Sequence, residues 1–132
     1  MRLYPQVPIL SRECLATDVI REVEVPAGSI MLVVPWLLHR HALLWNQPHR
    51  FIPKRFMPEW PARHAKFSYV PFSVGPRTCL GAAFGLTEAI LCLATLAQKF
   101  APRLAPQYRA SYECRLTLRP AEGLPMLLRR RA

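Results

Sequence analysis

One loop that contains a cysteine constrains the fold of this chain more than any other feature. The loop covers residues 71–81 and carries Cys79, and a long apolar segment, residues 82–100, follows it directly. Gly75 and Gly81 lack a side chain, so they allow backbone conformations and close approaches that a Cβ atom would block. The pattern therefore predicts a tight loop that presents a sulfur atom at the N-terminus of a long helix.

A thiolate that ligates haem iron requires a setting of this kind. It must approach the metal from a loop that tolerates close contacts, and it gains from backbone N–H groups and a helix N-terminus behind it. Phe72 adds an aromatic wall, and Arg77 places a cation two residues before Cys79. A lone cysteine is more often structural than ligating. The interpretation of Cys79 as the axial ligand of a haem iron therefore depends on the whole motif.

The spacing within this loop is similar to a known signature. The pattern Phe72-x-x-Gly75-x-Arg77-x-Cys79-x-Gly81 resembles the haem-binding motif of the cytochrome P450 monooxygenases at all five defining positions. So many fixed positions in so short a segment are a specific signal. The resemblance implies that these residues bind haem b and that Cys79 binds its iron.

Other segments resemble motifs of the same family, in the same order. Residues 2–5, Arg-Leu-Tyr-Pro, are similar to the end of its Glu-x-x-Arg helix. Residues 51–56, Phe-Ile-Pro-Lys-Arg-Phe, are similar to its Phe-x-Pro-x-Arg-Phe segment. Residues 116–120 and 124–128 are similar to its C-terminal strands. The resemblance thus extends over essentially the whole chain.

The resemblance also implies that the chain is incomplete. The glutamate of the Glu-x-x-Arg motif would precede Met1, so Arg2 would lack that ion-pair partner. Members of the family are roughly three times as long, whereas 132 residues would ordinarily make one domain. We therefore expect residues 1–132 to be the C-terminal, haem-binding third of a cytochrome P450 domain, truncated at the N-terminus, with Met1 an internal methionine.

The implied fold class is mainly α with small β-sheets, and this chain should contain one long helix plus short strands and loops. Residues 23–34 predict two short strands about a Pro-Ala-Gly turn, and residues 36–60 predict a packed, irregular loop with at most short helices. Residues 82–100 are apolar on nearly all sides, which predicts a helix buried between layers. Residues 112–118 alternate as a strand does, and a turn at 120–123 leads to the last strand.

The resemblance implies haem-thiolate monooxygenase chemistry, in which one oxygen atom of O2 is inserted into a small organic substrate. Arg77 is expected to bind a haem propionate, because a guanidinium pairs with a carboxylate through two parallel bonds. Arg12 occupies a position where relatives place a second propionate contact. The alternative, that Arg12 makes no contact with haem, stays open. An inactive truncated remnant and a peroxide-driven hydroxylase or isomerase of the same family remain alternatives.

The net charge of +10 predicts an acidic partner or an anionic surface. Several basic residues precede the cysteine loop: Lys54, Arg55, Arg63, His64 and Lys66. The resemblance implies that an acidic ferredoxin, flavodoxin or reductase delivers electrons at this face, and a merely solvated surface is the alternative. The arginines at 129–131 predict a disordered basic end. A nucleic-acid module is disfavoured, because the apolar residues lie in core-like runs rather than between the basic ones.

The other cysteines and histidines favour structural roles. Cys14, Cys92 and Cys114 form no Cys-x-x-Cys pair, which argues against a zinc ribbon or a dense disulfide scaffold and favours reducing surroundings. Within its apolar segment, Cys92 is expected to be a small buried hydrophobe. The histidines at 39, 41 and 49 lack the spacing of a two-histidine metal site on a helix. A cytoplasmic location is expected, and a membrane anchor before Met1 stays open.

Overall fold

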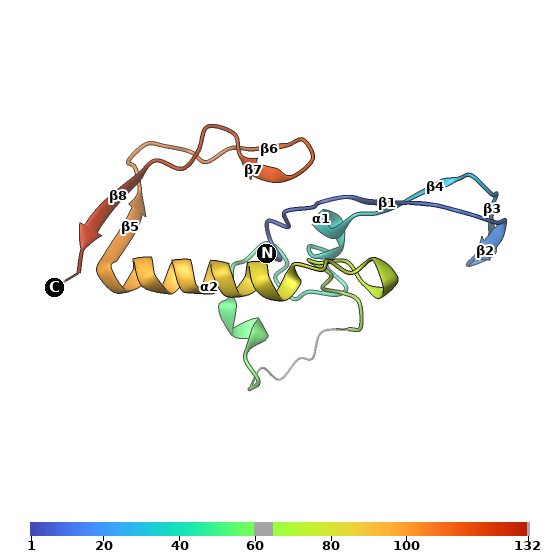
Figure 1. Cartoon of the computed structure of the whole chain (residues 1–132), viewed down its shortest axis with the longest axis horizontal. Coiled ribbons are helices and arrows are strands. Elements are labelled where there is room, and N and C mark those ends of the chain that lie inside the picture. Colours follow the sequence, from blue (N-terminus) through green and yellow to red (C-terminus); the bar gives the residue numbers. More distant parts are fainter. Residues whose placement is uncertain (60–64, 132) are drawn as a thin grey trace. The chain divides into compact units, whose positions relative to one another are not determined.

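The computed structural model describes residues 1–59 and 65–131, and the chain divides into two compact units, Met1–Pro71 and Phe72–Ala132. Figure 1 labels the main elements. The first unit contains β1 (Leu10–Glu13), β2 (Asp18–Ile20), β3 (Val23–Val25), β4 (Ile30–Val33), α1 (Pro35–Leu38) and the 3-10 helix η1 (Pro53–Phe56). The second contains the 3-10 helix η2 (Gly75–Arg77), α2 (Ala82–Lys99), β5 (Phe100–Leu104), β6 (Tyr112–Cys114), β7 (Leu118–Pro120) and β8 (Met126–Arg130). One long helix with short strands and loops is what the sequence predicts.

The four strands of the first unit form two antiparallel pairs, β1 with β4 and β2 with β3. The prediction of two strands in residues 23–34 is confirmed by β3 and β4, but these strands do not pair with each other. The Gly28 N–H donates to the Cys14 carbonyl over 2.7 Å, and the Cys14 N–H donates to the Ser29 carbonyl over 2.9 Å. These bonds draw the Pro-Ala-Gly turn into the β1–β4 ladder, so β3 pairs with β2 instead.

A two-residue turn connects β2 and β3. Its residues, Arg21 and Glu22, both have positive φ angles, 48° and 67°. Such angles suit the type I′ turn, whose twist matches that of the flanking strands. Glycine and asparagine are the usual residues there, because longer side chains strain the left-handed region. The backbone of this hairpin is therefore strained at Arg21 and Glu22.

The core of the first unit contains a group of aromatic rings. Trp45 is 1% exposed, and its ring lies 6.3 Å from the ring centroids of both Phe56 and Tyr69. The segment after β4 is irregular as predicted, with α1 and η1 as its short helices. Each of these begins at a proline, Pro35 or Pro53, whose fixed φ suits the first turn of a helix.

The long helix α2 confirms the predicted helix but ends one residue earlier, because Phe100 takes extended angles (φ −132°, ψ 148°) and begins β5. The prediction that this helix is buried is wrong for this chain, since no residue of α2 is buried and Leu93 is 69% exposed. A helix that is apolar all round needs layers on several sides. The described residues of the second unit supply only η2 and two-stranded pairs (Figure 1). Cys92, expected to be buried, is exposed for the same reason.

Two antiparallel pairs complete the second unit, β5 with β8 and β6 with β7. The prediction of one strand over residues 112–118 is wrong, because β6 ends at Cys114 and β7 begins at Leu118. The Arg115 N–H donates to the Thr117 carbonyl over 3.4 Å and closes a tight turn between them. The predicted turn before the last strand is confirmed by a bridge between residues 121 and 123.

The C-terminal arginines also differ from the prediction of a disordered end. Arg129 and Arg130 belong to β8, and the Arg131 N–H donates to the Lys99 carbonyl over 2.9 Å. The antiparallel ladder with β5 thus holds them in place. Across the described ranges, no helix has the length and apolar character that a membrane crossing requires.

Candidate cofactor site

The cysteine loop lies in the second unit and is held by hydrogen bonds to backbone carbonyls. Thr78 donates from its N–H and its hydroxyl to the Gly75 carbonyl, over 3.0 and 2.8 Å, and so closes η2. The Cys79 N–H donates to the Phe72 carbonyl over 2.9 Å. Gly75 has a φ of 71°, in the left-handed region where a Cβ atom strains the backbone. Glycine is therefore the residue that this turn requires.

Gly81 joins the loop to α2 under a different constraint. It is the N-cap residue with a φ of −83°, and a Cβ atom there would lie 3.9 Å from the Cys79 sulfur, an ordinary van der Waals distance. The loop by itself would therefore tolerate a side chain at this position. The N-terminus of α2, which follows directly, has a partial positive charge and no side-chain cap.

Cys79 is exposed and has exposed apolar neighbours. Its thiol is free, Leu80 is fully exposed, and Phe84 is 76% exposed. Large apolar side chains gathered at a surface mark a place where another group binds. Arg77 is exposed at the last position of η2. A free sulfur, an apolar rim and a nearby guanidinium fit the needs of a haem, namely an iron ligand, cover for the macrocycle and a partner for a propionate.

Arg12, the other predicted propionate contact, lies in β1 of the first unit. Its Nη1 donates to the Ser11 carbonyl over 2.7 Å. Because β1 and the cysteine loop belong to different units, the haem contact of Arg12 stays a prediction.

Arg2 is buried at the centre of a polar cluster in the first unit. Its Nη1 donates to the carbonyls of His39 and Pro48, both over 2.6 Å, and its Nη2 donates to the Arg50 carbonyl over 2.8 Å. The guanidinium also lies 4.9 Å from the ring centroid of Trp45, a favourable cation–π distance. Sequence reasoning missed these acceptors, because they are backbone atoms 37 to 48 residues away along the chain.

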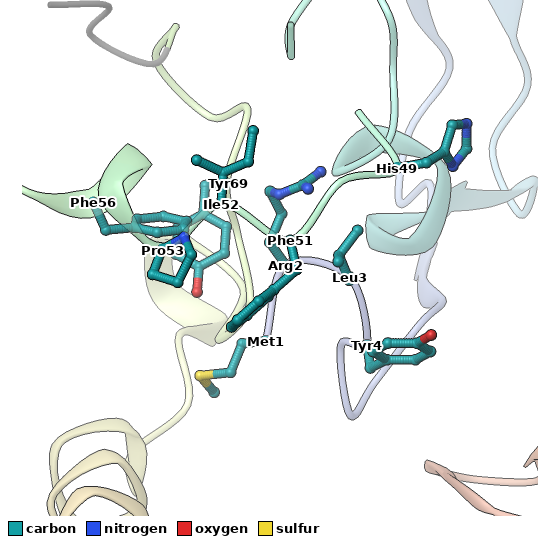
Figure 2. A pocket seen from close by; sticks show the side chains of 10 residues that line it. All are labelled: Met1, Arg2, Leu3, Tyr4, His49, Phe51, Ile52, Pro53, Phe56 and Tyr69. Carbon is teal, nitrogen blue, oxygen red and sulfur yellow. The ribbon is translucent and has the colours of Figure 1, made fainter. Parts of the chain in front are cut away.

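A pocket of about 700 Å³ lies beside Arg2 in the first unit, and Figure 2 shows the side chains around it. Its lining joins the N-terminal motif to the segment that contains η1: Met1, Arg2, Leu3, Tyr4, His49, Phe51, Ile52, Pro53, Phe56 and Tyr69. Burial lowers the pKa of Arg2, and the neighbouring Arg55 and Arg40 act in the same direction. Burial raises the pKa of Tyr69. The structure thus brings together two motifs that lie far apart in the sequence.

His39 is a buried, neutral imidazole beside this cluster. Its Nε2 accepts a hydrogen bond from the Val70 N–H over 3.0 Å, so Nδ1 carries the ring hydrogen. Nδ1 is buried without a hydrogen-bond acceptor in the described part of the chain. The pKa of His39 is lowered to about 4, mainly by burial, and the charges of Arg2 and Arg40 contribute in the same direction. Within residues 1–59 and 65–131, no three side chains of the metal-ligating types are grouped.

The basic residues that precede the cysteine loop differ in exposure. Lys54 and Lys66 are exposed, as a docking surface requires. The expectation that Arg55 belongs to this surface is wrong, because Arg55 is only 5% exposed and lies in the core of the first unit. Arg63 and His64 lie outside the described residues.

Comparisons with known proteins agree on one family. The family model for "Cytochrome P450" matches residues 1–122. Cytochrome P450 714C3 of Oryza sativa subsp. japonica is 38% identical over 130 residues, which are 97% of this chain and 25% of that protein. Cyclooctatin synthase of Streptomyces melanosporofaciens is 34% identical over 127 residues, 95% of this chain and 28% of that protein.

Solved structures give the same result. The cytochrome P450DA heme domain superposes with a TM-score of 0.91 at 31% identity, covering 99% of this chain and 29% of that one. Retinoic acid bound cyanobacterial CYP120A1 has a TM-score of 0.91 at 30% identity, covering 98% of this chain and 30% of that one. The chain therefore spans between a quarter and a third of the length of these four proteins. On these grounds the chain belongs to the cytochrome P450 family, whose members bind haem.

Proposed function

We propose that this chain supplies the proximal, haem-binding part of a haem-thiolate monooxygenase that inserts one oxygen atom of O2 into a small organic substrate. One observation carries the proposal: Cys79 is exposed on a glycine-dependent loop at the N-terminus of α2, within a complete five-position motif. Haem with a thiolate ligand supplies oxygen activation when it is bound, because the sulfur donates electron density to the iron.

The residues around Cys79 have separate parts in this proposal. The Phe72 carbonyl fixes the Cys79 backbone and so the direction of the sulfur. Phe72 limits the access of water to the sulfur once haem is bound, which keeps the sulfur a strong donor. Arg77 binds a propionate through its paired N–H donors, and Arg12 binds the second propionate.

An acidic electron donor, a ferredoxin, flavodoxin or reductase, is the partner that we propose for this enzyme. The exposed charges of Lys54 and Lys66 support it, because complementary charge accelerates the encounter of two proteins. Charge reversal at Lys54 and Lys66 should slow reduction of the haem at low ionic strength and leave its spectrum unchanged. A rate that is indifferent to salt would contradict this role.

A second candidate is a chain that has no monooxygenase activity by itself. Nearly all residues of α2 are exposed, and the others are half-buried. This exposure favours the inactive chain, because a haem bound at Cys79 would rest against a largely uncovered surface. Haem affinity of the 132-residue chain therefore bears on both candidates. Tight, stoichiometric haem binding with product formation from a chemical oxidant would exclude the inactive one.

The test of the haem ligand compares cysteines in one chain. Cys79→Ser should lose the red-shifted band that a thiolate ligand gives the reduced carbon monoxide complex of haem. Cys92→Ser is the matched control, because Cys92 is equally an exposed, free cysteine of the second unit. It should keep the band. Persistence of the band in Cys79→Ser would overturn the assignment.

A further inference from the structure

A second concave surface of the second unit gathers positive charge. A pocket of about 350 Å³ lies on the pair formed by β5 and β8. Ala101 and four arginines line it: Arg103, Arg129, Arg130 and Arg131. All four arginines are exposed, and none belongs to the cysteine motif. The site is therefore separate from the haem ligand in sequence and in lining.

The strand register places three of these arginines on one face. Ala101 lies opposite Arg129, and opposite residues of an antiparallel pair project from the same face. Arg103 follows Ala101 by two residues and Arg131 follows Arg129 by two, so the alternation of a strand returns them to that face. The bond from the Arg131 N–H to the Lys99 carbonyl, 2.9 Å long, extends the ladder to this residue. Ala101 and these three arginines all line the pocket.

The positive charge of this pocket has no acidic counterpart on β5, β8 or the residues that flank the pair. Residues 99–104 and 126–131 contain no Asp or Glu. The salt bridges of the second unit, within its described residues, join Glu113 to Arg115 and Arg119. The Nε of Arg131 donates to the Phe100 carbonyl over 3.3 Å, which leaves its other donors available. The four arginines bring like charges to one pocket, so an anion bound there would offset their mutual repulsion.

We propose that this pocket binds a phosphate group. A phosphate ester carries a charge of about −1.5 to −2 near neutral pH, so it offsets more of the repulsion than one carboxylate does. Its oxygens also accept the paired N–H donors of guanidinium groups. A pocket of about 350 Å³ is at the small end of ligand sites, and this favours a compact phosphate or diphosphate over an extended nucleic acid. A soluble phosphorylated molecule and a phospholipid headgroup both present this group.

The test uses the 132-residue chain and two variants with equal loss of charge. R103Q/R129Q/R131Q removes the shared face, and R21Q/R109Q/R115Q removes three exposed arginines elsewhere. Calorimetric titration with inorganic pyrophosphate probes the soluble source. Sedimentation with phosphatidylcholine vesicles that contain phosphatidic acid probes the lipid source. For pyrophosphate, for the vesicles or for both, R103Q/R129Q/R131Q should bind about tenfold or more weakly than the wild type. R21Q/R109Q/R115Q should bind the same ligand about as well as the wild type.

The outcomes separate a pocket from diffuse attraction. Equal weakening in both variants would show that only net charge matters and would overturn the proposal, as would the lack of binding in both arms. R103K/R129K/R131K keeps the charge and so guards against misfolding of the glutamine variant. It should bind several-fold more weakly than the wild type, because an ammonium lacks the paired donors. Wild-type affinity in this variant would overturn recognition by guanidinium groups, and none of these results depends on haem binding.

Discussion

Arg2 and Cys79 belong to the two motifs that the sequence singles out most clearly, and their surroundings are opposite. Arg2 is 5% exposed, and three backbone carbonyls of the same unit accept its hydrogen bonds. Cys79 is exposed, and so are the apolar residues Leu80 and Phe84 that follow it in the sequence. The first unit thus satisfies the donors of Arg2 internally, whereas the second unit leaves Cys79 at its surface. A motif with buried acceptors contributes to stability, and a motif with an exposed rim contributes to binding.

Of the changes considered, replacement of Arg2 should have the largest effect on stability. Arg2→Ala should lower the free energy of unfolding of the first unit by about 3–5 kcal/mol, since it leaves one buried and two partly buried carbonyls without this donor. Tryptophan fluorescence during urea denaturation measures this, because every tryptophan of the chain precedes residue 61. Lys54→Ala, an exposed control in the same unit, should stay within about 0.5 kcal/mol of the wild type. An effect of Arg2→Ala as small as the control's would show that the carbonyls find other donors.

Acid should weaken the first unit through His39. The folded pKa of about 4 lies below the ordinary 6.5, so the unfolded chain takes up a proton that the folded chain excludes. This contribution to stability is complete above about pH 6.5 and is lost as the pH falls toward 4, by at most about 1.4 kcal/mol per pH unit. The difference in unfolding free energy between wild type and His39→Gln should shrink over this range.

Two further measurements check the role of His39. His49→Gln, at an exposed position, should keep the acid sensitivity of the wild type. A nuclear magnetic resonance titration of the His39 ring reports its pKa without any substitution. A midpoint near 6.5 would contradict the burial of a neutral ring.

Two glycines of the second unit should respond with opposite signs. Gly75→Ala should cost about 1–2 kcal/mol, because a φ of 71° strains any residue with a Cβ atom. Amide hydrogen exchange at Thr78 and Cys79, whose N–H groups bond within the loop, should accelerate accordingly. Gly85→Ala is the matched control, since a Cβ atom there meets nothing within 4 Å and α2 should gain about 0.5–1 kcal/mol. Equal effects of the two changes would show that the loop adapts its backbone.

The smallest effect should come from the exposed face of α2. Leu93→Gln should change the stability of this chain by less than about 0.5 kcal/mol, because Leu93 is 69% exposed. Circular dichroism of the helix during thermal unfolding provides the measurement. A loss of several kcal/mol would mean that this leucine is packed, and the contrast between the two units would disappear.

Local sequence signals predicted the elements better than their surroundings. The α2 helix follows from a long apolar segment without prolines, and the turn at Gly75 follows from the backbone freedom of glycine, and both are signals within neighbouring residues. The exposure of α2 depends on which layers cover it, and no pattern within the helix contains that information. The acceptors of Arg2 are likewise distant backbone carbonyls, and because every residue has such a carbonyl, the sequence does not mark which ones accept. For the candidate site, the spacing around Cys79 pointed to the loop, whereas Arg12 lies in a different unit and its haem contact stays a prediction.

The placement of β2 and β3 between β1 and β4 in the sequence has a consequence for the order of folding. The β2–β3 hairpin closes over a two-residue turn, an event that takes about 1–10 μs in a typical hairpin. The ladder between β1 and β4 must close a longer loop, residues 14–29, at a greater entropic cost. Once the inner hairpin has formed, much of that loop is already ordered, so the outer strands meet across a shorter flexible path. The first unit is therefore expected to assemble this region from the inside outward, with the strain at Arg21 and Glu22 affecting the first step.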